Sequence, residues 1–157
     1  MMKKFIVAIP SGIFSILITV VVAYFTLASN PLDINSVTLF PGFDKFAHFV
    51  MYLVCTLIYL SEYAKYKLPH HTEINVELAI TAFACVMGLF FEVAQMALTN
   101  DRQFEFLDCL ANATGAITAF GIMHCWGMHA VREALYNTVI RRRRHRRHKK
   151  YRETDQD

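Results

Sequence analysis

The chain lacks the short motifs that mark the common hydrolases and metalloproteases. It contains no HExxH motif and no GxSxG motif, and no serine stands in a pattern that pairs it with a base. The four cysteines lie in apolar runs without CxxC spacing, which is typical of small buried hydrophobic residues rather than of a disulfide or a zinc site. Enzymatic functions therefore rank below binding functions for this chain.

Charge is also absent over one long stretch. Residues Phe5–Ala28 contain no Asp, Glu, Lys or Arg, and about 20 apolar residues suffice for a helix to cross a bilayer. Three further apolar runs follow, and hydrophobic residues make up 55% of the 157 residues. We predict an all-α, polytopic membrane protein: a four-transmembrane-helix bundle with short loops and a basic C-terminal tail.

The predicted membrane domain covers residues 1–140, with helices at about 5–28, 44–65, 77–98 and 106–128. Pro10-Ser11-Gly12 predicts a kink in the first helix. A cleaved secretory signal peptide is the alternative for this first run. Its apolar core is longer than the roughly 7–15 residues of such peptides, so we expect a retained helix.

Lys and Arg lie mainly on one side of the predicted bundle. Basic residues near helix ends mark the cytoplasmic side of a membrane protein. One side carries Lys3, Lys4, Lys65, Lys67, Arg132 and the tail, and the other carries Lys45 and Arg102. We therefore predict a multi-pass protein of the bacterial inner (cytoplasmic) membrane with both termini in the cytoplasm.

Residues 141–157 form the predicted tail, which we expect to be disordered. Its segment Arg141–Lys150 holds six Arg and two Lys, so the rest of the chain is net negative although the whole carries +3. Each basic residue near an anionic membrane surface contributes about 1 kcal/mol of attraction. We predict that the tail contacts anionic inner-leaflet lipid and not nucleic acid.

Polar side chains gather at the outer ends of three predicted helices. Asp44, His48 and Tyr52 follow i,i+4 spacing and share one helix face. Ionisable residues in membrane helices are rare and usually face a partner or a cavity. We predict one outward-facing ligand-binding cluster, which consists of Asp44, Lys45, His48, Tyr52, Glu92, Gln95, Arg102, Asp108 and Asn112.

The order and spacing of these residues resemble the VanZ-like family of small bacterial membrane proteins. The pattern is Asp44-Lys45-x-x-His48-x-x-x-Tyr52, Glu92-x-x-Gln95, Arg102 and Asp108-x-x-x-Asn112-x-x-Gly115. The resemblance covers most of the chain from the second helix to the fourth. It implies a cell-envelope context, because the family's founding member is associated with resistance to the antibiotic teicoplanin, and it implies no particular reaction.

Three functions are open for the cluster. In the favoured one, Lys45 and Arg102 hold the anionic group of a lipid, a lipid-linked cell-wall precursor or another amphiphile. The alternative is a membrane-embedded enzyme acting on an outer-leaflet lipid, with His48, Glu92 and Asp108 in acid–base catalysis or as ligands of a divalent metal. The third is structural, since hydrogen bonds between membrane helices contribute about 0.6–2 kcal/mol each. We expect no resident cofactor or metal ion.

The predicted topology places the loops around Ser36 and Asn100 outside the cell and Asn137 in the cytoplasm. Single cysteines at Ser36 and Asn100, in a cysteine-free background, should react with a membrane-impermeant maleimide in intact cells. A cysteine at Asn137 should react only after the cells are opened. Labelling at Asn137 alone in intact cells would reverse the orientation.

Overall fold

The computed structural model describes residues 10–27, 42–68, 70–98 and 105–136. Within these ranges the regular structure is helical: α2 (Ile13–Leu27), α3 (Phe43–Lys67), α4 (Ile74–Leu98), α5 (Phe106–Ile122) and the π-helical turn η2 (Met123–Gly127). The segments Phe43–Lys67, Ile74–Leu98 and Phe106–Tyr136 are long and apolar enough to cross a membrane, and α2 is shorter. The all-helical prediction is thus confirmed for the described residues, whereas the tail lies outside them.

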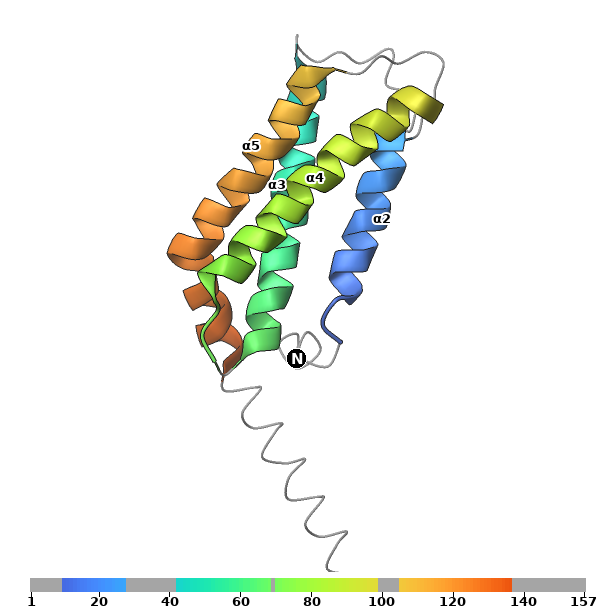
Figure 1. The fold of residues 1–157 in the computed structure, drawn as a ribbon. Helices are drawn as coiled ribbons and strands as arrows, with labels where there is room; N and C mark the ends of the chain where they lie inside the picture. The colour runs from blue at the N-terminus through green and yellow to red at the C-terminus, as the bar shows by residue number, and fades with distance from the viewer. Residues whose placement is uncertain (1–9, 28–41, 69, 99–104, 137–157) are drawn as a thin grey trace, which may run out of the picture.

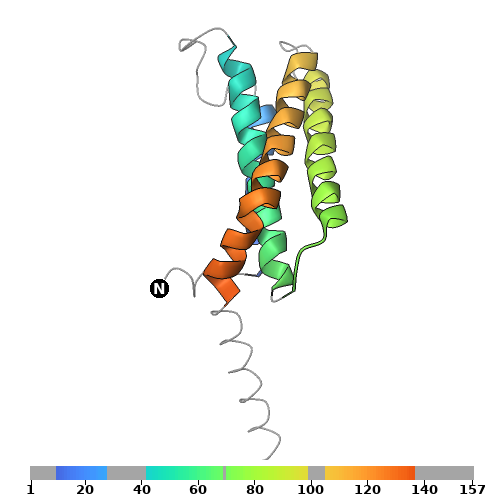
Figure 2. The same ribbon diagram turned by 90° about the vertical axis from the view of Figure 1, so that its left-hand side faces the viewer.

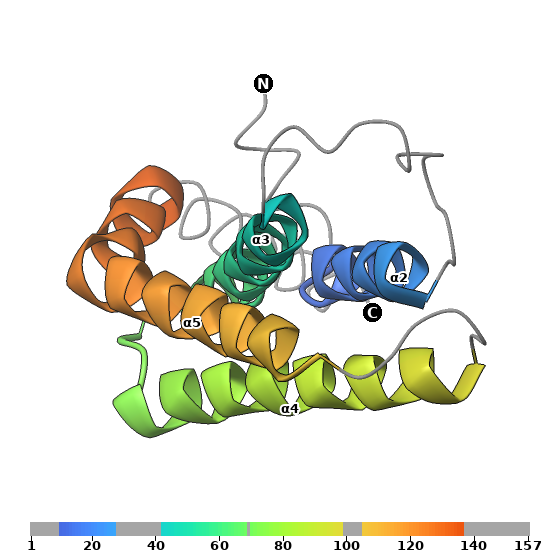
Figure 3. The same cartoon turned by 90° about the horizontal axis from the view of Figure 1, so that it is seen from above.

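Helix α3 occupies the middle of the bundle (Figure 1). Viewed from above, α2 lies on one side of α3 and α5 on the other, and α4 runs along the adjoining face (Figure 3). Helices α3 and α5 pack side by side over much of their length (Figure 2). The first turns of α3 and α5 lie at the same end of the bundle as the last turn of α4. The arrangement therefore brings the polar segments of these three helices to one end.

Gly115 allows α5 to pack directly on the backbone of α3. A Cβ atom at this position would overlap the carbonyl oxygen of Phe49 and lie 3.1 Å from the backbone nitrogen of Leu53. Buried Ala116 and Ala119 extend the same small-residue face of α5. Small residues let membrane helices approach closely, so this face fixes the separation of α3 and α5.

Helix α2 begins at Ile13, later than predicted for the first helix, while residues 5–9 lie outside the described part. Gly12 has a φ of 103°, a conformation that interrupts the helix. The buried carboxylate of Glu62, on α3, accepts hydrogen bonds from the backbone N–H groups of Gly12 and Ser15 at 3.0 and 2.9 Å. A carboxylate at a helix N-terminus satisfies unpaired N–H groups and complements the helix dipole. Glu62 thereby ties α2 to α3.

The last helix is longer than predicted. Its helical backbone does not end at residue 128 but continues through η2 to Tyr136. His124, within η2, lies with Nδ1 2.9 Å from Oε2 of Glu77 on α4, and Glu77 is buried. The π-helical turn thus carries a histidine that pairs with the carboxylate at the start of α4, at the opposite end of the bundle from the predicted cluster.

We expect Gly115→Ala to destabilise the bundle, because the added methyl group has no space beside Phe49. Overpacking of this kind costs about 1–3 kcal/mol, which would appear as a lower midpoint of thermal unfolding in detergent. Gly121→Ala is the matched control, since a Cβ at Gly121 meets nothing within 4 Å and alanine favours helix. Equal midpoints for the two variants would contradict the close α3–α5 packing.

Candidate functional site

The stripe predicted on α3 leads from the surface into the bundle. Gly42, with a φ of 85°, precedes the first helical residue, so Asp44 lies in the first turn. Asp44 is exposed, His48 is 5% exposed one turn further on, and Tyr52 is fully buried at the turn after that. The three side chains therefore pass from water to the interior along one face of α3.

The imidazole of His48 is held on one side by α4 and α5. Its Nδ1 atom lies 3.0 Å from Oδ1 of Asn112 and 3.4 Å from Oε1 of Glu92, and both partners are buried. An amide oxygen only accepts hydrogen bonds, so Nδ1 carries the proton and donates it to Oδ1 of Asn112. In the neutral ring Nε2 then carries the lone pair. The contacts fix both the orientation of the ring and the chemistry of its other nitrogen.

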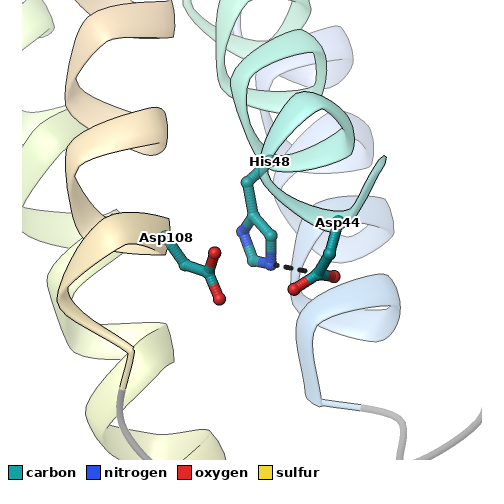
Figure 4. Close-up of side chains that lie close together, drawn as sticks. All are labelled: Asp44, His48 and Asp108. Carbon is teal, nitrogen blue, oxygen red and sulfur yellow. Dashed lines mark ion pairs between the residues drawn. The ribbon is translucent and has the colours of Figure 1, made fainter. Parts of the chain in front are cut away.

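Nε2 of His48 points toward the carboxylate of Asp44, and the carboxylate of Asp108 lies on the other side of the ring (Figure 4). The Nε2 atom lies 4.0 Å from Oδ1 of Asp44, which is beyond hydrogen-bonding distance. Asp108 approaches from α5 and is 5% exposed. One potential ligand atom from each of Asp44, His48 and Asp108 lies within 4.8 Å of the others. An imidazole nitrogen with two carboxylates is a donor set that suits divalent transition metals.

Lys45 is the cationic member of the cluster in the part of the chain that the structure describes. Its Nζ atom lies 3.1 Å from Oδ1 of Asp108 and 3.9 Å from Oδ2 of Asp44, and it forms an ion pair with Glu105. The side chain of Lys45 is 31% exposed, so the ammonium stands at the rim. With Glu92, the described cluster has four carboxylates and one ammonium.

A second polar layer lies beneath His48. The hydroxyl of Tyr52 is buried and has no hydrogen-bond partner within the described residues. Gly88 of α4 makes room for this layer, because a Cβ atom there would lie 3.1 Å from Cε1 of Tyr52 and 3.0 Å from Cβ of Asn112. A buried hydroxyl without a partner costs about 1–3 kcal/mol. The layer is therefore closely packed, yet Nδ2 of Asn112, like the Tyr52 hydroxyl, has no hydrogen-bond partner within the described residues.

The structure brings together most of the residues that the sequence assigned to a site. Contacts join Asp44, Lys45, His48, Glu92, Asp108 and Asn112. Tyr52 and Gln95 are buried, Gln95 one turn beyond Glu92 on α4, and Arg102 lies outside the described residues. The binding or catalytic roles of these residues remain predictions.

Glu105 is the member that sequence reasoning left out of the cluster. It lies directly before α5, and its side chain is 53% exposed while paired with Lys45. The available signal was its position three residues before Asp108, which places both carboxylates at the start of one helix. The ammonium of Lys45 consequently has two acidic partners from the beginning of α5.

Comparison with protein families matches residues 3–127 to the family described as VanZ/LLP1. The match includes α2 to η2 and every predicted site residue. No match was found among curated proteins or among solved structures. The resemblance stated from the motifs is thereby confirmed at the level of the family.

The contact between His48 and Asn112 can be measured by a double-mutant cycle. We expect His48→Ala and Asn112→Ala to be coupled by roughly 0.6–2 kcal/mol in unfolding free energy, the range for hydrogen bonds between membrane helices. Thr118, exposed on the same helix as Asn112, gives the control pair His48→Ala with Thr118→Ala, which should be additive. Additive effects in both cycles would argue against the contact.

Proposed function

Since the chain belongs to the VanZ/LLP1 family, we propose that this membrane protein binds the headgroup of an anionic amphiphile through the polar cluster. The observation that carries the proposal is the meeting of Asp44, His48, Glu92 and Asp108 at one end of a bundle of apolar helices. Charges placed in membrane helices are costly and mark functional sites more often than not. The position suits a ligand whose polar end lies at the membrane boundary.

Lys45 provides the first contact for the anionic group. Its ammonium is partly exposed at the rim and has a flexible stem, so it can turn toward a phosphate, pyrophosphate or carboxylate. Arg102, which precedes α5 in the sequence and lies outside the described residues, is the proposed second contact, with a guanidinium that can bind two oxygens at once. The hydroxyl of Tyr52 offers a buried donor without a partner in the described residues.

The predicted orientation turns this end of the bundle to the outside. In the outer leaflet of a bacterial inner membrane, anionic lipids and lipid-linked cell-wall precursors are the natural ligands of such a site. The cell-envelope context that the family resemblance implies agrees with this class of ligand. The basic tail, on the other side of the membrane, would serve attachment to anionic lipid and not the binding site.

A membrane-embedded enzyme that acts on an outer-leaflet lipid is the second candidate. The observation in its favour is the orientation of His48, whose Nδ1 is held by Asn112 and Glu92 while Nε2 points toward the carboxylate of Asp44. This is the arrangement of a general base with a positioned ring. The chemical identity of the lipid after incubation with the protein in vesicles distinguishes the two candidates. An enzyme converts the lipid, whereas a binding protein leaves it unchanged.

Lys45→Ala should reduce the amount of anionic lipid that co-purifies with the protein in native mass spectrometry. We expect about a tenfold loss of affinity, equivalent to about 1.4 kcal/mol, in a titration with an anionic lipid in detergent. Lys67→Ala is the matched control, because Lys67 also pairs with an exposed glutamate, Glu73 at 2.5 Å, but at the opposite end of the bundle.

The control variant should retain the lipid at the wild-type level. Equal retention by both variants would contradict the proposal. A lower unfolding midpoint for Lys45→Ala, with the bound lipid unchanged, would instead assign Lys45 a purely structural role.

A further inference from the structure

The side chain of His48 is buried, and its Nε2 atom lies 4.0 Å from Oδ1 of Asp44 and has no hydrogen bond within the described residues. Figure 4 shows the imidazole directed into the space between Asp44 and Asp108. We propose that Asp44, His48 and Asp108 bind a divalent transition-metal ion such as Mn²⁺ or Zn²⁺. The sequence favoured a site without metal, and its alternative metal site had Glu92 in the place that Asp44 takes here.

The distances fit a shared ion better than a direct contact. A hydrogen bond between Nε2 of His48 and Oδ1 of Asp44 would bring the two atoms to about 2.7–3.2 Å, whereas they are 4.0 Å apart. Two ligands at about 2.0–2.2 Å from one ion stand roughly 3–4 Å from each other. Asp108 offers a third ligand atom within 4.8 Å of the other two, and a small side-chain movement to about 4.4 Å or less would let all three reach one ion.

The hydrogen-bond partners of His48 also suit a metal-binding histidine. Histidines that bind a metal through one nitrogen usually donate the other N–H to a carboxylate or carbonyl group. Here Nδ1 faces Oδ1 of Asn112 and Oε1 of Glu92, so the proton is on the ring nitrogen that does not point toward Asp44. The lone pair of Nε2 is thereby directed to the place where the ion would bind.

The charge balance favours a cation. The described cluster contains four carboxylates and the single ammonium of Lys45. Buried carboxylates without sufficient compensation are destabilising in a low-dielectric environment. A divalent ion would compensate the buried Asp108, with the exposed Asp44 as its second carboxylate ligand, and these two come from different helices, α5 and α3.

Lys45 competes with this ion for Asp108. Its ammonium lies 3.1 Å from Oδ1 of Asp108 but also pairs with Glu105, which stands further toward the solvent. When the ion binds, the flexible Lys45 side chain can keep Glu105 and release Asp108. Removal of the ammonium should therefore strengthen metal binding. In a purely structural ion-pair network, removal of the ammonium would not strengthen metal binding, because Asp108 would lose its partner without gaining an ion.

A bound ion would also explain how an acidic cluster holds an anionic headgroup, because phosphate oxygens readily complete the coordination of a divalent ion. This consequence rests on the proposed function, whereas the metal site itself does not. The experiment below therefore uses the metal alone first and an anionic lipid second.

The test is a titration of the full chain, purified in detergent and freed of metal by EDTA, with Mn²⁺ followed by electron paramagnetic resonance. We expect one saturable site in the wild type. Asp44→Asn and His48→Gln should each weaken it at least tenfold, and Lys45→Met should tighten it. Asp44 is exposed, so Asn at this position should not disturb folding. His124→Gln, which alters the histidine paired with Glu77 at the other end, should leave the affinity unchanged.

Absence of a saturable site in the wild type, or equal affinities of the wild type and Asp44→Asn, would overturn the metal site. Weaker binding by Lys45→Met would overturn it as well. A second titration adds anionic lipid with and without the ion. Metal binding without any lipid binding would leave this inference standing and overturn the proposed function. Lipid binding by a protein that binds no metal would overturn this inference and leave the proposed function standing.

Discussion

The close contact of α5 with the backbone of α3 is the constraint on which the polar end of the bundle depends. Gly115 lies against Phe49, the residue that follows His48. One turn earlier on α5, Asn112 meets Nδ1 of His48, and one turn before that, Asp108 meets Lys45. Because the helix spacing is fixed at Gly115, the register of the other two contacts is fixed as well. A larger residue at 115 would move both polar contacts at once.

The other end of the bundle shows how this protein uses polar groups for structure alone. Glu62 is matched by donors from Gly12 and Ser15, and Glu77 is matched by His124. Each of these buried carboxylates has partners from one neighbouring segment, although Oε1 of Glu62 has none within the described residues. At the candidate site acidic groups outnumber cations within the described residues, and Nε2 of the buried His48 side chain has no hydrogen bond among them. The contrast favours a ligand over a structural role for the cluster.

Local spacing was sufficient to predict part of this site. The stripe of Asp44, His48 and Tyr52 follows from i,i+4 periodicity, and the ion pair of Lys45 with Asp108 follows from two helices that begin at the same end. Other features depend on tertiary register, which no single helix encodes. They include the capping of α2 by Glu62 from α3 and the use of Asn112 to orient His48.

The exposure gradient along α3 limits what the site can accept. Asp44 is open to solvent, His48 is nearly covered, and Tyr52 is fully enclosed beneath it, where Gly88 lets α4 close against Asn112. A ligand that enters from this end therefore meets carboxylates and the ammonium of Lys45 first, and finds a closed floor two helical turns below Asp44. Because the polar side chains lie at this end and the outward faces of the helices are apolar, the proposed amphiphile would place its headgroup beside Asp44 and His48 and its apolar part in the lipid around the helices.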